Sequence, residues 1–145
     1  MKTARQFLKE KPDPALYAVT PGATVYQALQ LMAEVDVGAV LVMEGEALVG
    51  LFSERDYARK IVLEGKSSAG TPVADVMTRK VAYAAPSHTL EQCMALMAGN
   101  RVRHLPVMED HTVLGVLSIS DLVNEQVADQ RFVISQLEHY IHDLR

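Results

Sequence analysis

The 145-residue sequence predicts an α+β fold built from two related repeats. Residues 21–56 recur as residues 86–121, at a spacing of 65 and without a gap, with 13 identical residues. Each copy has apolar residues at helical spacing, followed by two short apolar runs around a turn. Both copies end on the pattern Gly-x-x-Ser-x-x-Asp, at Gly50–Asp56 and Gly115–Asp121. A duplicated unit predicts a module with pseudo-two-fold symmetry and two related clefts.

The first repeat reads as helix, strand, helix, strand, strand, helix. Thr24 is a suitable N-cap for the apolar residues at helical spacing that follow it. The Glu-Gly-Glu turn at residues 44–46 joins two apolar runs into a hairpin. The expected helices are Ala4–Leu8, Val25–Val35 and Ser53 to about Leu63, and the expected strands are Leu16–Val19, Ala39–Met43 and Ala47–Phe52.

The second repeat follows the same order and adds a C-terminal extension. Thr71-Pro72, with proline at the first helical position, opens a short helix expected at Val73–Met77. Expected next are a strand at Val81–Tyr83, a helix after Thr89, strands at His104–Met108 and Thr112–Leu117, and a helix at Ile119–Leu144. The boundaries are therefore 1–65 for repeat one, 66–72 for a linker, 73–128 for repeat two and 129–145 for the extension.

Composition excludes several function classes. The net charge is −4 and the basic residues are scattered, so no footprint for duplex nucleic acid is expected. The single cysteine, Cys93, rules out an intrachain disulfide and fits a reducing compartment. The N-terminus lacks the apolar region of a secretory signal, and no apolar run is long enough to cross a bilayer. We therefore expect a cytoplasmic protein without nucleic-acid or membrane partners.

The Ser-x-x-Asp element has a structural and a functional interpretation. Ser53-x-x-Asp56 and Ser118-x-x-Asp121 match a helix start, where serine caps and the acid faces the positive end of the helix dipole. The same carboxylate could accept hydrogen bonds from a ribose diol, as acidic residues do in dinucleotide-binding folds. One aspartate can do both, so both interpretations stay open.

Catalytic and metal sites find little support. Ser53 and Ser118 have no histidine with an orienting acid nearby in sequence, which argues against nucleophilic catalysis. His139 and His142 lie one helical turn apart, but no third metal ligand is evident. We expect neither an enzyme, nor a metal site, nor a required cofactor.

The chain resembles the cystathionine-β-synthase (CBS) domains, which occur as tandem pairs called Bateman modules. The resemblance rests on the duplicated Gly-hydrophobic-x-Ser-x-x-Asp ending, on Arg103-His-Leu-Pro-Val107 and on the element order, and covers roughly residues 3–127. It implies two pseudo-two-fold-related repeats that bind adenosine compounds: AMP, ADP, ATP, NAD(H) or S-adenosylmethionine derivatives.

The resemblance also implies which residues bind. Asp56 and Asp121 would hold ribose, with Ser53 and Ser118 beside them. Arg103 would hold phosphate in the second copy, and Arg55 or Lys80 in the first, so that the two sites are unequal and the second is the better phosphate site. The remaining implied contacts are Thr20 and Ala85 in the base pockets, and Ala39 and His104 at base or phosphate.

The leading hypothesis is a regulatory sensor that binds adenine nucleotides and signals to a protein partner. The alternatives are a ligand-free dimerisation or scaffold module and, with less support, a small enzyme acting on nucleotides. Ile134, Leu137, Ile141 and Leu144 recur at 3-4-3 spacing on the final helix, and this apolar seam must be buried against the module or another chain. We therefore expect a homodimer.

Overall fold

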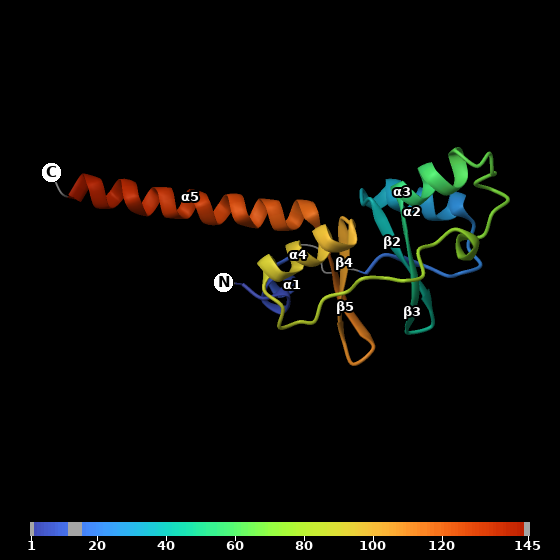
Figure 1. The fold of residues 1–145 in the computed structure, drawn as a ribbon, viewed down its shortest axis with the longest axis horizontal. Coiled ribbons are helices and arrows are strands. Elements are labelled where there is room, and N and C mark those ends of the chain that lie inside the picture. The colour runs from blue at the N-terminus through green and yellow to red at the C-terminus, as the bar shows by residue number, and fades with distance from the viewer. Residues whose placement is uncertain (1, 12–15, 144–145) are drawn as a thin grey trace.

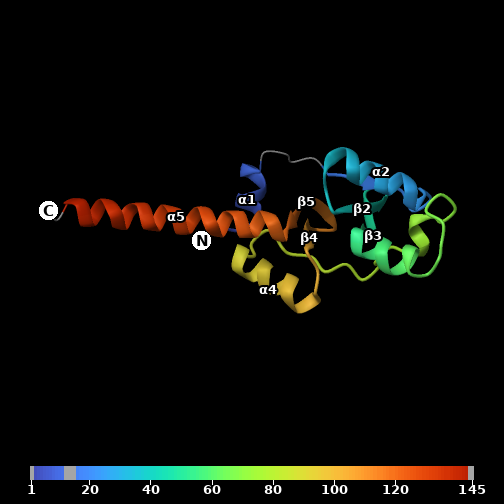
Figure 2. The same ribbon diagram turned by 90° about the horizontal axis from the view of Figure 1, so that it is seen from above.

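The computed structural model describes residues 2–11 and 16–143, and in these residues it has the predicted α+β architecture. Two small sheets with flanking helices form the body, and a long helix projects from it (Figures 1 and 2). The elements are α1 (Ala4–Glu10), β1 (Ala18–Val19), α2 (Val25–Val35), β2 (Ala39–Glu44), β3 (Ala47–Ser53), α3 (Glu54–Tyr57), the π-helix η1 (Ala58–Val62), the 3-10 helix η2 (Val73–Asp75), α4 (Leu90–Asn100), β4 (His104–Glu109), β5 (Thr112–Ser118) and α5 (Ile119–Asp143).

The two repeats share their local geometry. Thr24 and Thr89 each cap a helix through a capping box with the glutamine three residues later. The antiparallel hairpins β2–β3 and β4–β5 shift register at equivalent places, between Val42 and Met43 and between Val107 and Met108. The sequence repeat is therefore a structural repeat down to its irregularities.

Three short elements differ from the prediction. The strand expected at Val81–Tyr83 is wrong: only Ala84 pairs, through a single parallel bridge to Val107. The strand expected at Leu16–Val19 is reduced to β1, which pairs in parallel with β2. The helix expected at Val73–Met77 is the 3-10 turn η2, with Pro72 at its N-cap. Segments this short are set by tertiary contacts rather than by their own propensity.

The leading segment of each repeat packs against the other repeat. Ala4 of α1 is buried in the core of the second repeat with Cys93, Leu105 and Leu117, and Thr3 bridges Thr89. In return, the η2 segment enters the core of the first repeat. The residues buried together there are Val25, Ala28, Met32, Val40, Val42, Phe52, Ile61, Val73, Val76 and Met77. The repeats are thus tied together by an exchange of their first elements.

The two sheets meet through a small third core. Leu41 and Leu51 of the first repeat pack with Val113 of the second, and all three are buried. This contact lies between the hairpins, in the middle of the body. It joins the two repeats face to face.

The predicted C-terminal helix is confirmed over the described residues, since α5 runs unbroken from Ile119 to Asp143. At 1.5 Å per residue it is about 37 Å long. Its apolar seam is not covered by the body, because Ile134, Leu137 and Ile141 are more than half exposed. The fourth seam residue, Leu144, lies outside the described residues.

None of the helices within residues 2–11 and 16–143 has the length and apolarity needed to cross a membrane. The same residues contain no group of three or more His, Cys, Asp or Glu side chains placed to hold a metal ion.

Candidate functional site: two unequal clefts

Two clefts lie between the repeats, and each contains one of the duplicated aspartates. The Asp56 cleft has a volume of about 880 Å³ and the Asp121 cleft about 390 Å³. They share a wall, because Gly38, Leu51, His104, Ser118 and Ser120 line both. The two clefts therefore lie next to each other and are separated by these shared residues.

Asp56 is buried and held by donors from its own repeat and from the η2 segment. Its Oδ2 accepts from the backbone N–H of Ser53 (3.0 Å), and its own N–H donates to Ser53 Oγ (3.2 Å). Thr78 Oγ1 donates to Oδ1 (3.1 Å), and Lys60 Nζ lies 3.0 Å from the same oxygen. The capping interpretation is thus confirmed here. A ribose diol would have to replace Thr78 or Lys60 at this carboxylate.

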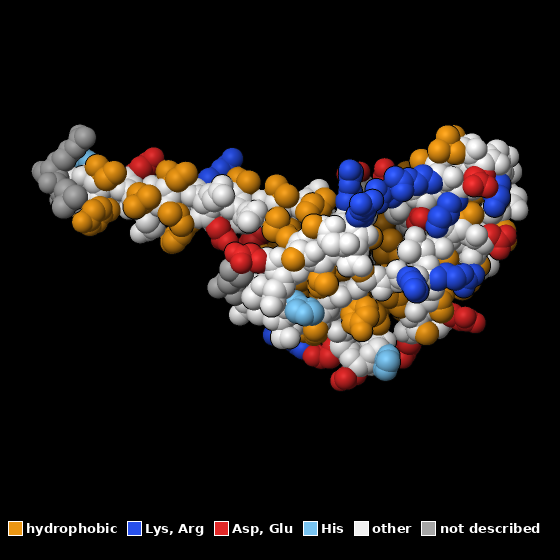
Figure 3. All heavy atoms as spheres, viewed as in Figure 1, with side chains coloured by type: hydrophobic (Ala, Val, Ile, Leu, Met, Phe, Trp, Pro, Cys, Tyr) orange, Lys and Arg blue, Asp and Glu red, His pale blue; other side chains and the backbone are white. Residues whose placement is uncertain are grey.

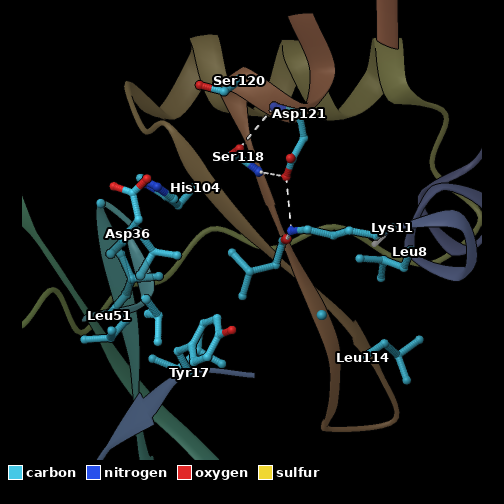
Figure 4. A pocket seen from close by; sticks show the side chains of 18 residues that line it. Leu8, Lys11, Tyr17, Asp36, Leu51, His104, Leu114, Ser118, Ser120 and Asp121 are labelled. Atoms are coloured by element: carbon cyan, nitrogen blue, oxygen red, sulfur yellow. Dashed lines mark hydrogen bonds and ion pairs between the residues drawn. The ribbon is translucent and has the colours of Figure 1, made fainter. Parts of the chain in front are cut away.

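Asp121 caps α5 in the same way but is more open. Its Oδ2 accepts from the backbone N–H of Ser118 (2.9 Å) and lies 3.2 Å from Lys11 Nζ. Figure 4 shows Lys11 reaching from the end of α1 toward this carboxylate, with Tyr17 across the cleft. No described residue donates a hydrogen bond to Asp121 Oδ1, so this oxygen can accept one from a ligand.

The net charges of the residues that line the two clefts differ in sign. The charged side chains of the Asp56 cleft are Arg55, Arg59, Lys60, Lys80, Arg101 and Arg103, against Glu54 and Asp56. In the Asp121 cleft the described lining has one cation, Lys11, against Asp36 and Asp121. Figure 3 shows Lys and Arg side chains gathered over the junction of the two halves of the body. The Asp56 cleft is therefore suited to an anionic ligand.

This arrangement corrects the sequence-based pairing of cations with aspartates. Arg101 and Arg103 of repeat two line the cleft of Asp56, whereas Asp36 of repeat one lines the cleft of Asp121. The reason is that each cleft combines the helix start of one repeat with the strand start of the other. The two clefts differ in charge and size, and the cation-rich cleft is the one around Asp56.

The other residues singled out by sequence divide between the clefts. Ser53, Arg55, Lys80 and Arg103 line the Asp56 cleft, and Ala39 lines the Asp121 cleft. Thr20 and Ala85 line neither cleft. The backbone N–H of Ala85 instead donates to Nδ1 of His88 (2.8 Å), which closes the turn before α4.

His104 and Ser118 lie on the shared wall. Burial lowers the pKa of His104, an effect opposed by the nearby carboxylates of Glu54 and Asp121 and reinforced by Lys11 and Arg103. His104 is therefore neutral at pH 7. A neutral imidazole between the clefts can both donate and accept a hydrogen bond.

Several lining residues had no sequence signal strong enough to find them. Thr78 reaches Asp56 across 22 residues, and Lys11 reaches Asp121 across 110. Lys60 alone could have been found, because it stands four residues after Asp56 on the same helical segment.

The glycine of the duplicated motif serves packing. A Cβ at Gly50 would lie 2.5 Å from Met77 Sδ, and a Cβ at Gly115 would lie 2.6 Å from a Leu8 methyl group. The close approach to the backbone that these glycines allow is therefore made by Met77 and Leu8 of the exchanged leading segments, and not by a ligand.

Comparison with known proteins agrees with this architecture. The CBS domain model matches residues 8–63 and 73–128. The chain is 40% identical over 127 residues to the CBS domain-containing protein CBSX3, mitochondrial, of Arabidopsis thaliana, covering 84% of this chain and 62% of that protein. It is 29% identical over 123 residues to the CBS domain-containing protein YhcV of Bacillus subtilis, covering 85% and 87%. The chain thus spans less than two thirds of the Arabidopsis relative.

Solved structures give the same result. A candidate signal-transduction protein with CBS domains from Burkholderia ambifaria superimposes with a TM-score of 0.85 at 48% identity, covering 89% of this chain and 96% of that one. The CBS-domain structure NE2398 gives 0.82 at 46% identity, covering 87% and 98%. These names describe domain content and, for the Burkholderia protein, signal transduction, but no reaction.

Proposed function

Because the chain belongs to the CBS-domain family, as a tandem pair of the regulatory or sensor class, we propose that it is a non-enzymatic sensor of adenine nucleotides. The ligand would be AMP, ADP, ATP or NAD(H), bound in the Asp56 cleft. The observation that carries this proposal is the convergence of six Lys and Arg side chains from both repeats on one cleft of about 880 Å³. That volume is within the range of small-molecule sites.

The charge of the cleft favours phosphorylated ligands. Arg101 and Arg103 come from the second repeat, whereas Arg55, Arg59 and Lys60 come from the first. A polyphosphate placed among them would make charge-assisted hydrogen bonds with both repeats at once. A ligand that bridges the repeats favours one relative placement of them, and a protein partner can read that placement.

Titration calorimetry of the full chain with adenosine, AMP, ADP, ATP, NAD(H) and S-adenosylmethionine tests the proposal. Affinity should rise from adenosine to AMP to ATP, and it should fall as salt is added. Arg103→Ala should weaken ATP binding about tenfold or more, since a hydrogen bond to a charged group is worth about 1.5–3 kcal/mol. Lys66→Ala is the matched control, because Lys66 is exposed and lines neither cleft.

Two results would overturn the proposal. Equal affinity for adenosine and ATP would show that the Lys and Arg side chains of the cleft do not bind the phosphates. Equal affinity for inorganic triphosphate and ATP would show that the cleft reads charge and not the nucleoside.

A ligand-free scaffold is the second candidate, and one observation favours it. Both oxygens of Asp56 already accept hydrogen bonds from protein donors, so this carboxylate is satisfied as a cap. Absence of binding to every compound of the panel would support the scaffold.

In both cases we propose a homodimer in a reducing compartment such as the cytoplasm. The unpaired, buried Cys93 supports the compartment, and the uncovered seam of α5 supports the dimer.

A further inference from the structure

The hydrogen-bonding capacity of the Asp56 carboxylate is filled by the protein itself. A carboxylate offers about four acceptor positions, two on each oxygen. Oδ2 accepts from the backbone N–H of Ser53 (3.0 Å) and from Ser53 Oγ (3.2 Å). Oδ1 accepts from Thr78 Oγ1 (3.1 Å) and from Lys60 Nζ (3.0 Å). Protein donors therefore occupy the positions at which a ligand hydroxyl would bind.

Lys60 is held at this carboxylate from a second direction. Its Nζ also donates to the backbone oxygen of Val76 (2.9 Å), in the segment that enters the core of the first repeat. Moving the ammonium group away would break the ion pair and this part-buried hydrogen bond together. Because an ammonium group has three donors, one remains for a phosphate in the cleft while Lys60 stays on Asp56.

Thr78 is fixed by its backbone. Its N–H donates to the carbonyl oxygen of Leu51 (2.8 Å), and its own carbonyl oxygen accepts from the Leu51 N–H (3.0 Å). Leu51 lies in β3 and is buried. The position of the Thr78 hydroxyl is thus set by pairing with a strand. Both donors to Oδ1 belong to contacts that hold the fold together.

These contacts determine what Asp56 can do for a ribose. A ligand hydroxyl that replaces Thr78 or Lys60 exchanges one hydrogen bond for another and leaves the displaced donor unpaired, so it adds no net affinity. The charge of Asp56 is also compensated by Lys60. The cleft as a whole has six Lys and Arg side chains against two carboxylates, so a further phosphate on the ligand meets attraction and not repulsion.

We propose that Lys60 sets which nucleotides the Asp56 cleft takes. With Lys60 and Thr78 on Asp56, the cleft does not select a free ribose diol, and it takes nucleotides whose 2′ position is deoxy or phosphorylated at least as well as the plain ribonucleotide. This inference rests on the proposed function, because it names the class of nucleotide bound in that same cleft.

Calorimetric titration of the full chain with two matched pairs of ligands tests the inference. The pairs are ATP with 2′-deoxyATP, and NADH with NADPH, which differs from NADH by a phosphate at the 2′ position. ATP and 2′-deoxyATP should bind within about twofold of each other. NADPH should bind about tenfold more tightly than NADH, since its added phosphate gains a charge-assisted hydrogen bond. A tenfold preference for ATP over 2′-deoxyATP, or for NADH over NADPH, would overturn the inference.

Lys60→Met tests the role of the ammonium group directly. Methionine keeps much of the aliphatic stem, frees one position on Oδ1 and leaves the charge of Asp56 uncompensated. The variant should therefore prefer ATP to 2′-deoxyATP, and NADH to NADPH, by about tenfold. The ratio of the two dissociation constants is compared within one variant, so a loss of stability or of phosphate binding that affects both ligands cancels.

Lys80→Met is the matched control. It removes the same charge from the lining of the same cleft and leaves the donors of Asp56 in place, so both ratios should stay as in the parent protein. Ratios that Lys60→Met leaves unchanged would overturn the inference. If Lys60→Met does not fold, the two ratios of the parent protein decide alone. If the parent binds none of the four ligands, the proposed function fails as well, whereas a parent that binds ATP but rejects 2′-deoxyATP refutes this inference only.

Discussion

Replacing Asp56 with alanine should destabilise the fold more than replacing Asp121, although the two residues are equivalent in sequence. Asp56 is 7% exposed and accepts from Ser53, Thr78 and Lys60. Its removal leaves the Ser53 N–H and the Thr78 hydroxyl without their acceptor.

The magnitude follows from these contacts. Loss of the capping interaction costs about 1 kcal/mol, and loss of the Thr78 hydrogen bond costs about 1 kcal/mol more. The half-exposed Lys60 pair adds at most about 0.5 kcal/mol, because solvent screens it. The sum is about 2 to 2.5 kcal/mol of unfolding free energy, or roughly 5–10 °C in Tm. For Asp121, the cap and the Lys11 pair together give about 1 to 1.5 kcal/mol.

Urea unfolding and calorimetric melts of both alanine variants measure this difference. Glu54→Ala is the matched control, since Glu54 is an exposed carboxylate one residue into the same helix, and its loss should stay within about 0.5 kcal/mol. If Asp56→Ala costs no more than Asp121→Ala, the contacts of Thr78 and Lys60 contribute nothing and the reasoning fails. ATP at about 100 times its dissociation constant should add ~2.7 kcal/mol to the parent protein. If Asp56→Ala keeps this full increment, Asp56 is a cap and does not touch the ribose.

Three further results are expected. Burial lowers the pKa of His104, so the unfolded chain binds more protons and stability falls as the pH drops from about 6.5 toward that lowered pKa. His104→Asn should therefore reduce the change in the urea midpoint between pH 7.5 and 5.5. An unchanged pH dependence of the midpoint would contradict this. Gly50→Ala should cost about 1–3 kcal/mol and more than Gly115→Ala in urea unfolding. Its Cβ would also meet the backbone oxygen of Thr78 at 3.1 Å, whereas at Gly115 only side-chain atoms of Leu8 are in the way. Cys93, buried with its thiol pKa raised by burial, should react with a thiol reagent only on unfolding, and fast labelling of the native protein would show an open core.

The parts of the fold that the sequence predicts well are those encoded by neighbouring residues. Thr24 and Thr89 mark helix starts through their own capping boxes, and the hairpins follow from short apolar runs around a turn. The bridge at Ala84 and the 3-10 turn η2 were misassigned because contacts from distant segments decide them.

The candidate site was harder to predict for the same reason. Each repeat contains an aspartate and a charged segment before its hairpin, and it is natural to combine those that lie in one repeat. The structure combines Asp56 with Arg101 and Arg103 of the other repeat, through a symmetry that no local pattern expresses. Apart from Thr20 and Ala85, the residues expected from the sequence line the two clefts, but their grouping across the repeats could not be read from it.

The exchange of leading segments has a consequence for how the chain matures during synthesis. Thr3 is synthesised 86 residues before its bridging partner Thr89. At about 5–20 residues per second, α1 waits about 4 to 17 seconds for the core it will occupy. During that interval Ala4, Phe7 and Leu8 have no site to enter, while the first repeat in turn lacks Val73 and Met77 until the linker has been made. Neither half can complete its core before part of the other has been made, so both halves expose apolar side chains over a span in which a single independent repeat would already have buried them.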